Sequence, residues 1–255
     1  MRGLKGKVAV VTGGGSGIGR AAAERLAEEG CRVAALDWNE ANVEEAVAGM
    51  VAAGGEAIAL KVDVGDEAAV AAAFRTIIER FGRVDIVCSN AGIFTAERDG
   101  KVDELPKSVW DEIVGVNLTG MFHTCKYGIA AIKETAGKGA VVLTGSPTGI
   151  LGCTPASTAY SSSKAGVHGL ARVMAVDYAQ EGIRVNVVIP GFTLSPLVRE
   201  LVADPEVYEW NVKNIPMRRG AEPDEIAGAV AFLASDDASY MTGSFITVDG
   251  GLTAV

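Results

Sequence analysis

The chain has 255 residues, of which 49% are apolar and 22% charged, which is enough for one large domain or two small ones with a substantial buried core. Its formal net charge is −9. Nucleic-acid binding depends on clustered cationic surface, so the acidic balance argues against a nucleic-acid partner.

The sequence has no feature typical of a membrane or secreted protein. No apolar run reaches the ~18–20 residues that a membrane-spanning helix needs. The apolar stretch near the start covers only residues 8–11 and leads into a glycine loop, so we expect a strand there and no signal peptide. The cysteines form no C-x-x-C pair, so we expect reduced thiols, no metal site and a cytoplasmic protein. These cysteines are Cys31, Cys88, Cys125 and Cys153.

Short β-branched runs alternate with helix-length, alanine-rich segments along the chain. The candidate strands are 7–12, 32–37, 57–62, 84–89, 140–144, 184–189 and 245–248. The candidate helices are 17–29, 40–53, 66–80, 106–133, 158–181 and 223–235. The strand candidates are continuously apolar, as is typical of strands buried on both faces of a parallel sheet. The sequence therefore predicts a single α/β domain over residues 1–255, with a doubly wound, mainly parallel seven-stranded sheet and helices on both faces.

A long connection at residues 193–216 interrupts this alternation and carries Tyr208 and Trp210. A connection of that length inside a compact domain is often a lid over a functional site. We expect a substrate lid here, and a plain surface excursion is the alternative.

A glycine-rich turn, T-G-G-G-S-G-I-G at residues 12–19, joins the first strand to the first helix. Such a turn lets the backbone approach a pyrophosphate at the N-terminus of the helix, as in Rossmann-like folds. We expect Gly13 to make the turn, Gly17 to allow the close approach and Gly19 to pack the helix on the strand. Ser16 and Ile18 complete this predicted dinucleotide-binding loop.

The second strand ends at Asp37, and Trp38 follows it. A carboxylate at this place accepts hydrogen bonds from the adenosine ribose hydroxyls and repels a 2′-phosphate. No Lys or Arg stands at positions 14–16 or 38 to receive that phosphate, although Arg20 lies just beyond. The pattern therefore favours NAD over NADP, and a turn-forming Asp is the simpler alternative.

Residues 160–164 read Y-S-S-S-K, which places Tyr160 and Lys164 four apart on one helix face. Taken alone, this pair is usually a polar helix start. A free tyrosine has a pKa near ~10, so a phenol that works as a base near pH ~7 needs about 4 kcal/mol of stabilisation of its phenolate. The interaction of the phenolate with a close ammonium and a positive nicotinamide ring provides stabilisation of that order.

The whole chain resembles the short-chain dehydrogenase/reductase family. The motifs that carry the resemblance occur in the family's order: T-G-G-G-S-G-I-G (12–19), Asp63-Val64, S-N-A-G (89–92), Asn117, Ser146, Y-S-S-S-K (160–164), P-G (190–191) and V-D-G-G (248–251). Ser89 and Ser195 depart from the usual residues of the family at their positions. Ser146 lies slightly farther from Tyr160 than is common, so a local insertion is expected in the active-site loop.

The resemblance implies the remaining contacts to the cofactor. Asp63 and Val64 would line the adenine. The segment Asn90, Ala91 and Gly92 would border the adenosine and nicotinamide ribose region. The residues implied along the nicotinamide carboxamide are Pro190, Gly191 and Thr193.

The resemblance also implies the catalytic roles. Tyr160 would take the alcohol proton while the hydride leaves for the nicotinamide, and Lys164 would contact both the ribose and the phenol. Ser146 would orient the substrate oxygen, and Asn117 would hold a water that links Lys164 to solvent. We prefer Ser146 to Ser157 because Ser146 ends a strand, at the sheet edge where ligands bind in this architecture.

Two further features fit packing roles. His123 and His168 lie among apolar residues of helical segments, so we expect them to be core residues. The segments 106–133 and 158–181 are apolar on more than one face, which indicates a homo-oligomer. The family resemblance suggests a homotetramer built on these helices.

We expect an NAD-dependent oxidoreductase acting on a secondary alcohol or its ketone: a sugar, polyol, hydroxy acid or cyclic alcohol. The first alternative is a 3-oxoacyl-[acyl-carrier-protein] reductase. Asp37, the acidic surface and Glu181, where such reductases tend to carry arginine, disfavour it. The second, a non-catalytic NAD-binding sensor, predicts the loss of at least one of the four catalytic residues, and all four are present. The expected pocket lining is Phe94, Thr95, Pro147, Thr148, Cys153, Thr154, Phe192 and Leu194.

Overall fold

The computed structural model describes residues 1–195, 198 and 202–254, and it contains one seven-stranded sheet in the order β3-β2-β1-β4-β5-β6-β7. Every neighbouring pair is parallel. The strands are β1 Val8–Thr12, β2 Arg32–Asp37, β3 Glu56–Lys61, β4 Ile86–Ser89, β5 Gly139–Thr144, β6 Ile183–Pro190 and β7 Phe245–Val248. The predicted doubly wound α/β fold is confirmed. From β1, the strands β2 and β3 are added on one side and the strands β4 to β7 on the other. The strand order therefore reverses between β1 and β4, and ligands bind at such a switch point.

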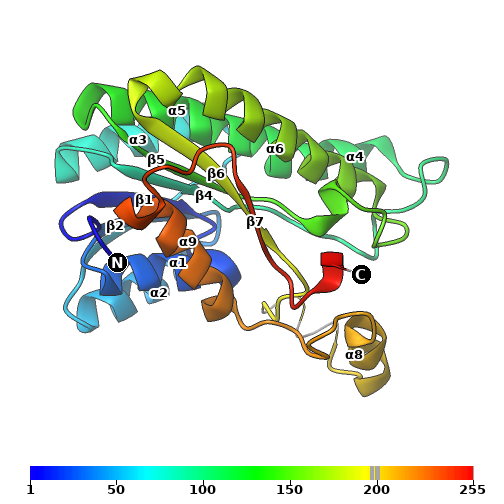
Figure 1. Ribbon diagram of the computed structural model, residues 1–255. Helices are drawn as coiled ribbons and strands as arrows, with labels where there is room; N and C mark the ends of the chain where they lie inside the picture. Colours follow the sequence, from blue (N-terminus) through cyan, green and yellow to red (C-terminus); the bar gives the residue numbers. More distant parts are fainter. Residues whose placement is uncertain (196–197, 199–201, 255) are drawn as a thin grey trace.

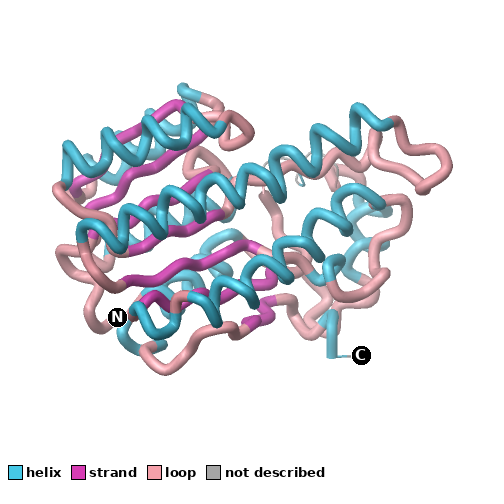
Figure 2. Tube along the Cα trace, turned by 90° about the horizontal axis from the view of Figure 1, so that it is seen from above, coloured by secondary structure: helices cyan, strands magenta, loops and turns pink. Residues whose placement is uncertain are grey.

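Helices cover both faces of the sheet (Figure 1). The layer of α3, α5 and α6 packs on one face through a core that includes Phe74, Ile129 and Val167. The layer of α1, α2 and α9 packs on the other face, and Leu26 and Ile226 belong to that core. The bounds are α1 Gly17–Glu28, α2 Glu40–Ala52, α3 Glu67–Phe81, α4 Lys107–Val114, α5 Met121–Thr135, α6 Thr158–Asp177, α8 Pro205–Val212 and α9 Pro223–Ala234. Viewed from above, the helices run side by side along the strands (Figure 2).

The predicted helix at 106–133 is interrupted in the structure. After α4, the π-helical segment η1 (Gly115–Gly120) leads into α5. A π-helical turn inserts one extra residue in a helix and is common at functional sites. Here it contains Asn117. Hydrophobic periodicity does not reveal such a turn, because the apolar face continues on both sides of it.

The predicted long connection contains the short helix α8, which the sequence analysis did not identify. Asp204 caps it by accepting a hydrogen bond from Glu206 N at 2.8 Å, and Pro205 opens its first turn. In Figure 1, α8 stands apart from both helix layers, on the side where β7 ends and the C-terminus lies. Residues 196–197 and 199–201 of the predicted lid lie outside the described part of the chain.

None of the helices in the described ranges combines the length and the apolar character needed to cross a membrane.

Candidate active site

The glycine loop lies where the sequence analysis expects it, between β1 and α1. Gly13 and Gly17 have φ values of +69° and +52°, a region that L side chains rarely adopt. A Cβ atom on Gly19 would collide with the carbonyl oxygen of Gly13, so the first turn of α1 needs a glycine at this position to pack against the loop. Thr12 Oγ1 accepts hydrogen bonds from Asn90 N at 3.1 Å and Ala91 N at 3.2 Å, which ties this loop to the end of β4.

Asp37 is fixed at the end of β2 beside the glycine loop. It is 8% exposed, its Oδ2 accepts from Gly15 N at 3.0 Å, and its Oδ1 accepts from Asn39 N at 3.0 Å. Each carboxylate oxygen therefore keeps one lone pair for a further donor. Trp38 is 73% exposed beside it. Arg20 is held by Glu24 at 2.8 Å and by Glu45 at 2.9 Å, so its charge is already paired.

The other predicted cofactor residues lie along the same edge of the sheet. Asp63 is exposed after β3, and its Oδ1 accepts from Gly65 N at 2.8 Å. Val64 is buried, and its carbonyl oxygen lies 3.0 Å from His123 Nδ1. Asn90 Oδ1 accepts from Thr144 Oγ1 at 3.0 Å. The contact between Asn90 and Thr144 joins the ends of β4 and β5. His123 is buried on α5 and holds the segment after β3.

Gly92 connects this strip to the predicted catalytic residues. A Cβ atom on Gly92 would lie 3.2 Å from Asn117 Oδ1 and 3.7 Å from Lys164 Nζ. The predicted ribose-binding segment and two predicted catalytic side chains therefore meet at one place.

Tyr160 and Lys164 lie together on the first turns of α6. Lys164 is 3% exposed, and its Nζ lies 5.7 Å from the centroid of the Tyr160 ring. The ammonium donates to the carbonyl oxygen of Thr144 at 2.9 Å. Thr144 therefore anchors Lys164 through its backbone and Asn90 through its hydroxyl. Sequence reasoning missed this residue, although its position one before Gly145-Ser146, at the strand end, was a usable signal.

Ser146 follows β5 and caps the short 3-10 helix η2 (Pro147–Gly149). Its Oγ lies 3.0 Å from Thr148 Oγ1 and accepts from Thr148 N at 3.3 Å. The alternative serine, Ser157, donates to the carbonyl oxygen of Thr154 at 2.6 Å. Of the two serines, Ser146 is the one with a hydrogen-bond contribution that lowers the pKa of the Tyr160 phenol.

Burial shifts the pKa values of both members of the pair. It raises the pKa of Tyr160 above the usual value for a phenol, and a hydrogen-bond contribution from Ser146 opposes this rise. Burial also lowers the pKa of Lys164 to about 8. These groups leave the pKa of the phenol above its usual value, so the acidified phenol that we expect from the sequence stays a prediction and needs a further positive charge bound beside Tyr160.

Asn117 is fully buried, and its side chain is bound to protein atoms. Its Oδ1 accepts from Ile93 N at 2.7 Å, and its Nδ2 donates to Ile93 O at 2.9 Å and to Ser163 Oγ at 3.2 Å. Both amide hydrogens are used, so the side chain fixes the segment after β4 against α6. Its expected link to a water stays a prediction.

His168 has a second role besides packing. Its ring contacts Phe245 edge-on at 5.2 Å, as expected of a core residue, and its Nε2 accepts from Ser146 N at 3.4 Å. Burial, Arg172 and Lys164 lower the pKa of His168 to about 4, so the ring is neutral near pH ~7. The spacing from Lys164 to His168, one turn along the same helix face, was the signal in the sequence.

The end of β6 carries the last predicted cofactor residues, Pro190, Gly191 and Thr193. Thr193 Oγ1 donates to Gly191 O at 3.1 Å, and Thr193 bridges to Ala221. The Phe192 ring between them lies 6.3 Å from the Tyr208 ring of α8. The helix α8 of the predicted lid is thus adjacent to the predicted nicotinamide segment.

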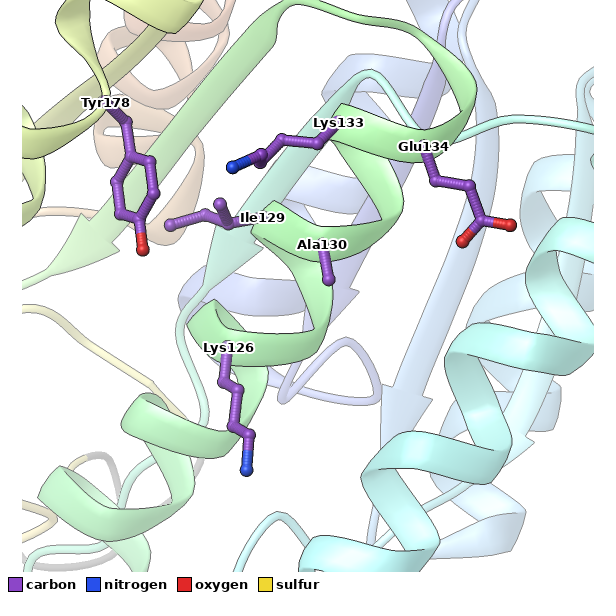
Figure 3. Close-up of a pocket in the computed structure, with 6 residues that line it drawn as sticks. All are labelled: Lys126, Ile129, Ala130, Lys133, Glu134 and Tyr178. Atoms are coloured by element: carbon purple, nitrogen blue, oxygen red, sulfur yellow. The ribbon is translucent and has the colours of Figure 1, made fainter.

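A separate surface hollow of about 510 Å³ lies over α5, lined by Lys126, Ile129, Ala130, Lys133, Glu134 and Tyr178 (Figure 3). In Figure 3, Lys133 points toward Tyr178, which follows the last residue of α6. Tyr160 is at the opposite end of that 20-residue helix, so the hollow is remote from the predicted catalytic residues. Among the residues that the structure describes, no group of three or more His, Cys, Asp or Glu could hold a metal ion.

Comparison with known proteins places these features in a family. A family model described as "Enoyl-(Acyl carrier protein) reductase" matches residues 13–253. The chain belongs to the short-chain dehydrogenase/reductase family, and it is an oxidoreductase of the class acting on CH–OH groups.

Three relatives illustrate the range within the family. The chain is 42% identical over 249 residues to cis-4-hydroxycyclohexanecarboxylate dehydrogenase of Sinomonas cyclohexanicum, which covers 98% of this chain and 97% of that one. It is 36% identical over 251 residues to a 3-oxoacyl-[acyl-carrier-protein] reductase of Thermotoga maritima, which covers 98% of both chains. A solved structure of a putative NAD(P)-dependent gluconate 5-dehydrogenase from Beutenbergia cavernae, with bound NADP at low occupancy, superimposes with a TM-score of 0.92. That protein is 34% identical, and the match covers 99% of this chain and 98% of that one.

Proposed function

We propose that this protein is an NAD-dependent dehydrogenase that interconverts a secondary alcohol and its ketone, with Tyr160 as the general base. The observation that carries the proposal is the meeting of Tyr160, Lys164 and Ser146 at the carboxyl edge of the sheet, beside the glycine loop. A sensor that had lost catalysis would have no need for all of these groups together.

When bound, NAD supplies the hydride acceptor. The chain's own residues provide the proton transfer and the orientation. Ser146 orients the substrate oxygen toward the phenol, and Tyr160 accepts the alcohol proton at its hydroxyl oxygen. Lys164, held by Thr144, keeps a positive charge next to the phenol and stabilises the phenolate. Asn117 holds the segment after β4 in place and, as expected from the sequence, links Lys164 to solvent through a water.

The geometry around Asp37 supports NAD as the cofactor. Its carboxylate lies where the 2′-hydroxyl of an adenosine ribose binds in this fold, and the nearby Arg20 is paired with two glutamates. We assign Trp38, the next residue, as a further contact to the cofactor. We assign the remaining cofactor contacts as the sequence predicts them: the glycine loop with Gly13, Ser16, Gly17, Ile18 and Gly19, then Asp63, Val64, Asn90, Ala91, Gly92, Pro190, Gly191 and Thr193.

The substrate is a small-molecule alcohol or ketone, taken from the sugars, polyols, hydroxy acids and cyclic alcohols. The Tyr160 and Phe94 rings make a T-shaped contact with centroids 4.9 Å apart, and the Thr148 hydroxyl is next to Ser146. An aromatic wall and a hydroxyl on the same site suit a ring or chain that carries polar groups. Residues 193–216, which include α8, are proposed as the lid over this site.

The alternative is a 3-oxoacyl-[acyl-carrier-protein] reductase, and the 36% identity to the Thermotoga maritima reductase is the observation in its favour. Asp37 disfavours NADPH as the cofactor. The net charge of −9 disfavours docking of an acidic carrier protein. Glu181 is paired with Lys133 at 2.6 Å, so it neutralises a cation that a carrier could otherwise contact.

We further propose a cytoplasmic homotetramer. The outward face of α6 is built from small and apolar residues, with Val173 and Val176 strongly exposed. A surface of this kind is normally covered in an assembly.

The proposal is tested by following reduced nicotinamide with a panel of secondary alcohols, sugars and sugar acids, using NAD and NADP in parallel. NAD should be preferred by at least ~100-fold in kcat/KM, about 2.7 kcal/mol.

Tyr160→Phe should lose at least ~10³-fold in turnover while NAD still binds. Equal use of the two cofactors would overturn the NAD assignment. More than about a tenth of normal activity in Tyr160→Phe would overturn the general base.

A further inference from the structure

The catalytic helix α6 begins without a cap from its own sequence. Ser157 stands at the N-cap position, where a serine usually accepts from an amide of the first turn. Its hydroxyl instead donates to Thr154 O at 2.6 Å and lies 3.2 Å from Ser161 Oγ. The free amides of this turn therefore need another acceptor, because buried backbone donors are nearly always paired.

Asp99, from the segment between β4 and α4, provides that acceptor. Its Oδ1 accepts from Ala159 N at 3.0 Å, and its Oδ2 accepts from Tyr160 N at 2.9 Å. Oδ1 also accepts from Gly100 N at 2.9 Å, and the side chain is only 7% exposed. One buried carboxylate thus holds the backbone of the predicted general base from a residue 61 positions away.

Neighbouring contacts fasten the same loop to the same helix turn. Thr158 Oγ1 donates to Gly100 O at 2.6 Å, and Asp99 N donates to Thr95 O at 2.8 Å. The Phe94 ring at the start of this loop contacts the Tyr160 ring edge-on. The loop and the catalytic tyrosine therefore share both a backbone attachment and a side-chain contact.

We propose that Asp99 is a positioning residue for Tyr160: it caps the catalytic helix from the substrate-side loop and so fixes where the phenol lies relative to Ser146. This inference rests on the proposed role of Tyr160. Loss of one N-cap destabilises a helix only modestly, whereas a displacement of ~1 Å at a reacting group costs about 10²-fold in rate. The effect on catalysis is therefore expected to exceed the effect on folding.

The test compares Asp99→Ala, Asp99→Asn and the control Asp66→Ala. Asp66 is also a helix cap: it stands at the N-terminus of α3, where its Oδ1 accepts from Ala68 N at 2.9 Å and Ala69 N at 3.2 Å. Asp99→Ala should lower kcat at least ~10-fold, with the NAD dissociation constant changed less than about twofold. Asp99→Asn should recover part of the loss, because its amide oxygen still accepts from one of the two amides. Asp66→Ala should lower the melting temperature and leave kcat unchanged.

A second readout does not depend on activity. Amide hydrogen exchange at residues 158–161 should be at least ~10-fold faster in Asp99→Ala and unchanged in Asp66→Ala. Faster exchange with kcat within about twofold of the unaltered protein would reduce Asp99 to a structural cap and overturn the proposal. Unchanged exchange would overturn the capping itself. If the unaltered protein oxidised none of the panel alcohols, the proposed function would fail while the exchange result still decided the cap.

Discussion

At the scale of single residues, burial disfavours the charged form of both members of the proposed catalytic pair. Lys164 is almost fully buried, its ammonium has the carbonyl oxygen of Thr144 as an acceptor, and burial lowers its pKa to about 8. Tyr160 beside it has its pKa raised by the same cause. Neither shift favours the charged state that the proposed reaction needs. We therefore expect a bound cationic cofactor to favour the phenolate, which would link catalysis to cofactor binding.

The buried ammonium leads to a prediction about stability. The pKa of Lys164 is about 8 in the folded chain and ~10.4 in an unfolded one, so between these values the unfolded chain binds more protons and stability rises with pH. The penalty at pH ~7 is about 3 kcal/mol, and it is relieved above pH ~10. Lys164→Met should therefore be at least as stable as the unaltered protein at pH ~7 and lose this advantage toward pH ~10. Urea unfolding of both proteins across this range measures the difference. A constant difference would mean that Lys164 does not titrate as described.

At the scale of elements, the sequence predicts the strands within one or two residues, because buried parallel strands are continuously apolar and end at glycine-rich turns. It does not predict η1, whose extra residue leaves the apolar pattern unchanged. The same limit applies to the site. Tyr160, Lys164 and Ser146 are visible as local patterns. Thr144 and Asp99 act through contacts between distant segments. The place of Thr144 at a strand end is a local signal, but no local pattern encodes the contact of Asp99 with Tyr160.

His168 joins three elements, and its titration should be visible in acid. It lies on α6, contacts Phe245 of β7 and accepts from Ser146 N after β5. Its pKa is about 4 when folded and ~6.5 when unfolded, with Arg172 and Lys164 as the facing cations. The unfolded chain binds more protons between these values, so stability should fall as pH decreases from ~6.5 toward ~4, by up to about 3 kcal/mol. His168→Gln should remove this part of the pH dependence in urea unfolding. Equal slopes for the two proteins would contradict the assignment.

At the scale of the whole molecule, the two helix layers differ in what they expose. The outward face of α6 presents Ala165, Gly169, Val173 and Val176 to solvent, and Val176 is 78% exposed. Nothing lies within 4 Å of a Cβ atom placed on Gly169, so a longer side chain there meets open space in the single chain. A large substitution at Gly169 can therefore disturb an assembly without disturbing the fold of one subunit.

If α6 packs against a second copy, Gly169→Glu places a charge in that interface, where an unpaired buried charge is strongly unfavourable. The variant should sediment as a smaller species than the unaltered protein, which we expect to be a tetramer. Gly49→Glu is the matched control: Gly49 lies on α2 in the opposite layer, is exposed and also has no atom within 4 Å of an added Cβ. Both changes replace a helical glycine by the same residue, so their effects on helix propensity cancel in the comparison. Sedimentation velocity at micromolar concentration distinguishes the outcomes. If Gly169→Glu and Gly49→Glu sediment alike, α6 is not the surface through which subunits associate, and its exposed valines face solvent in the native protein.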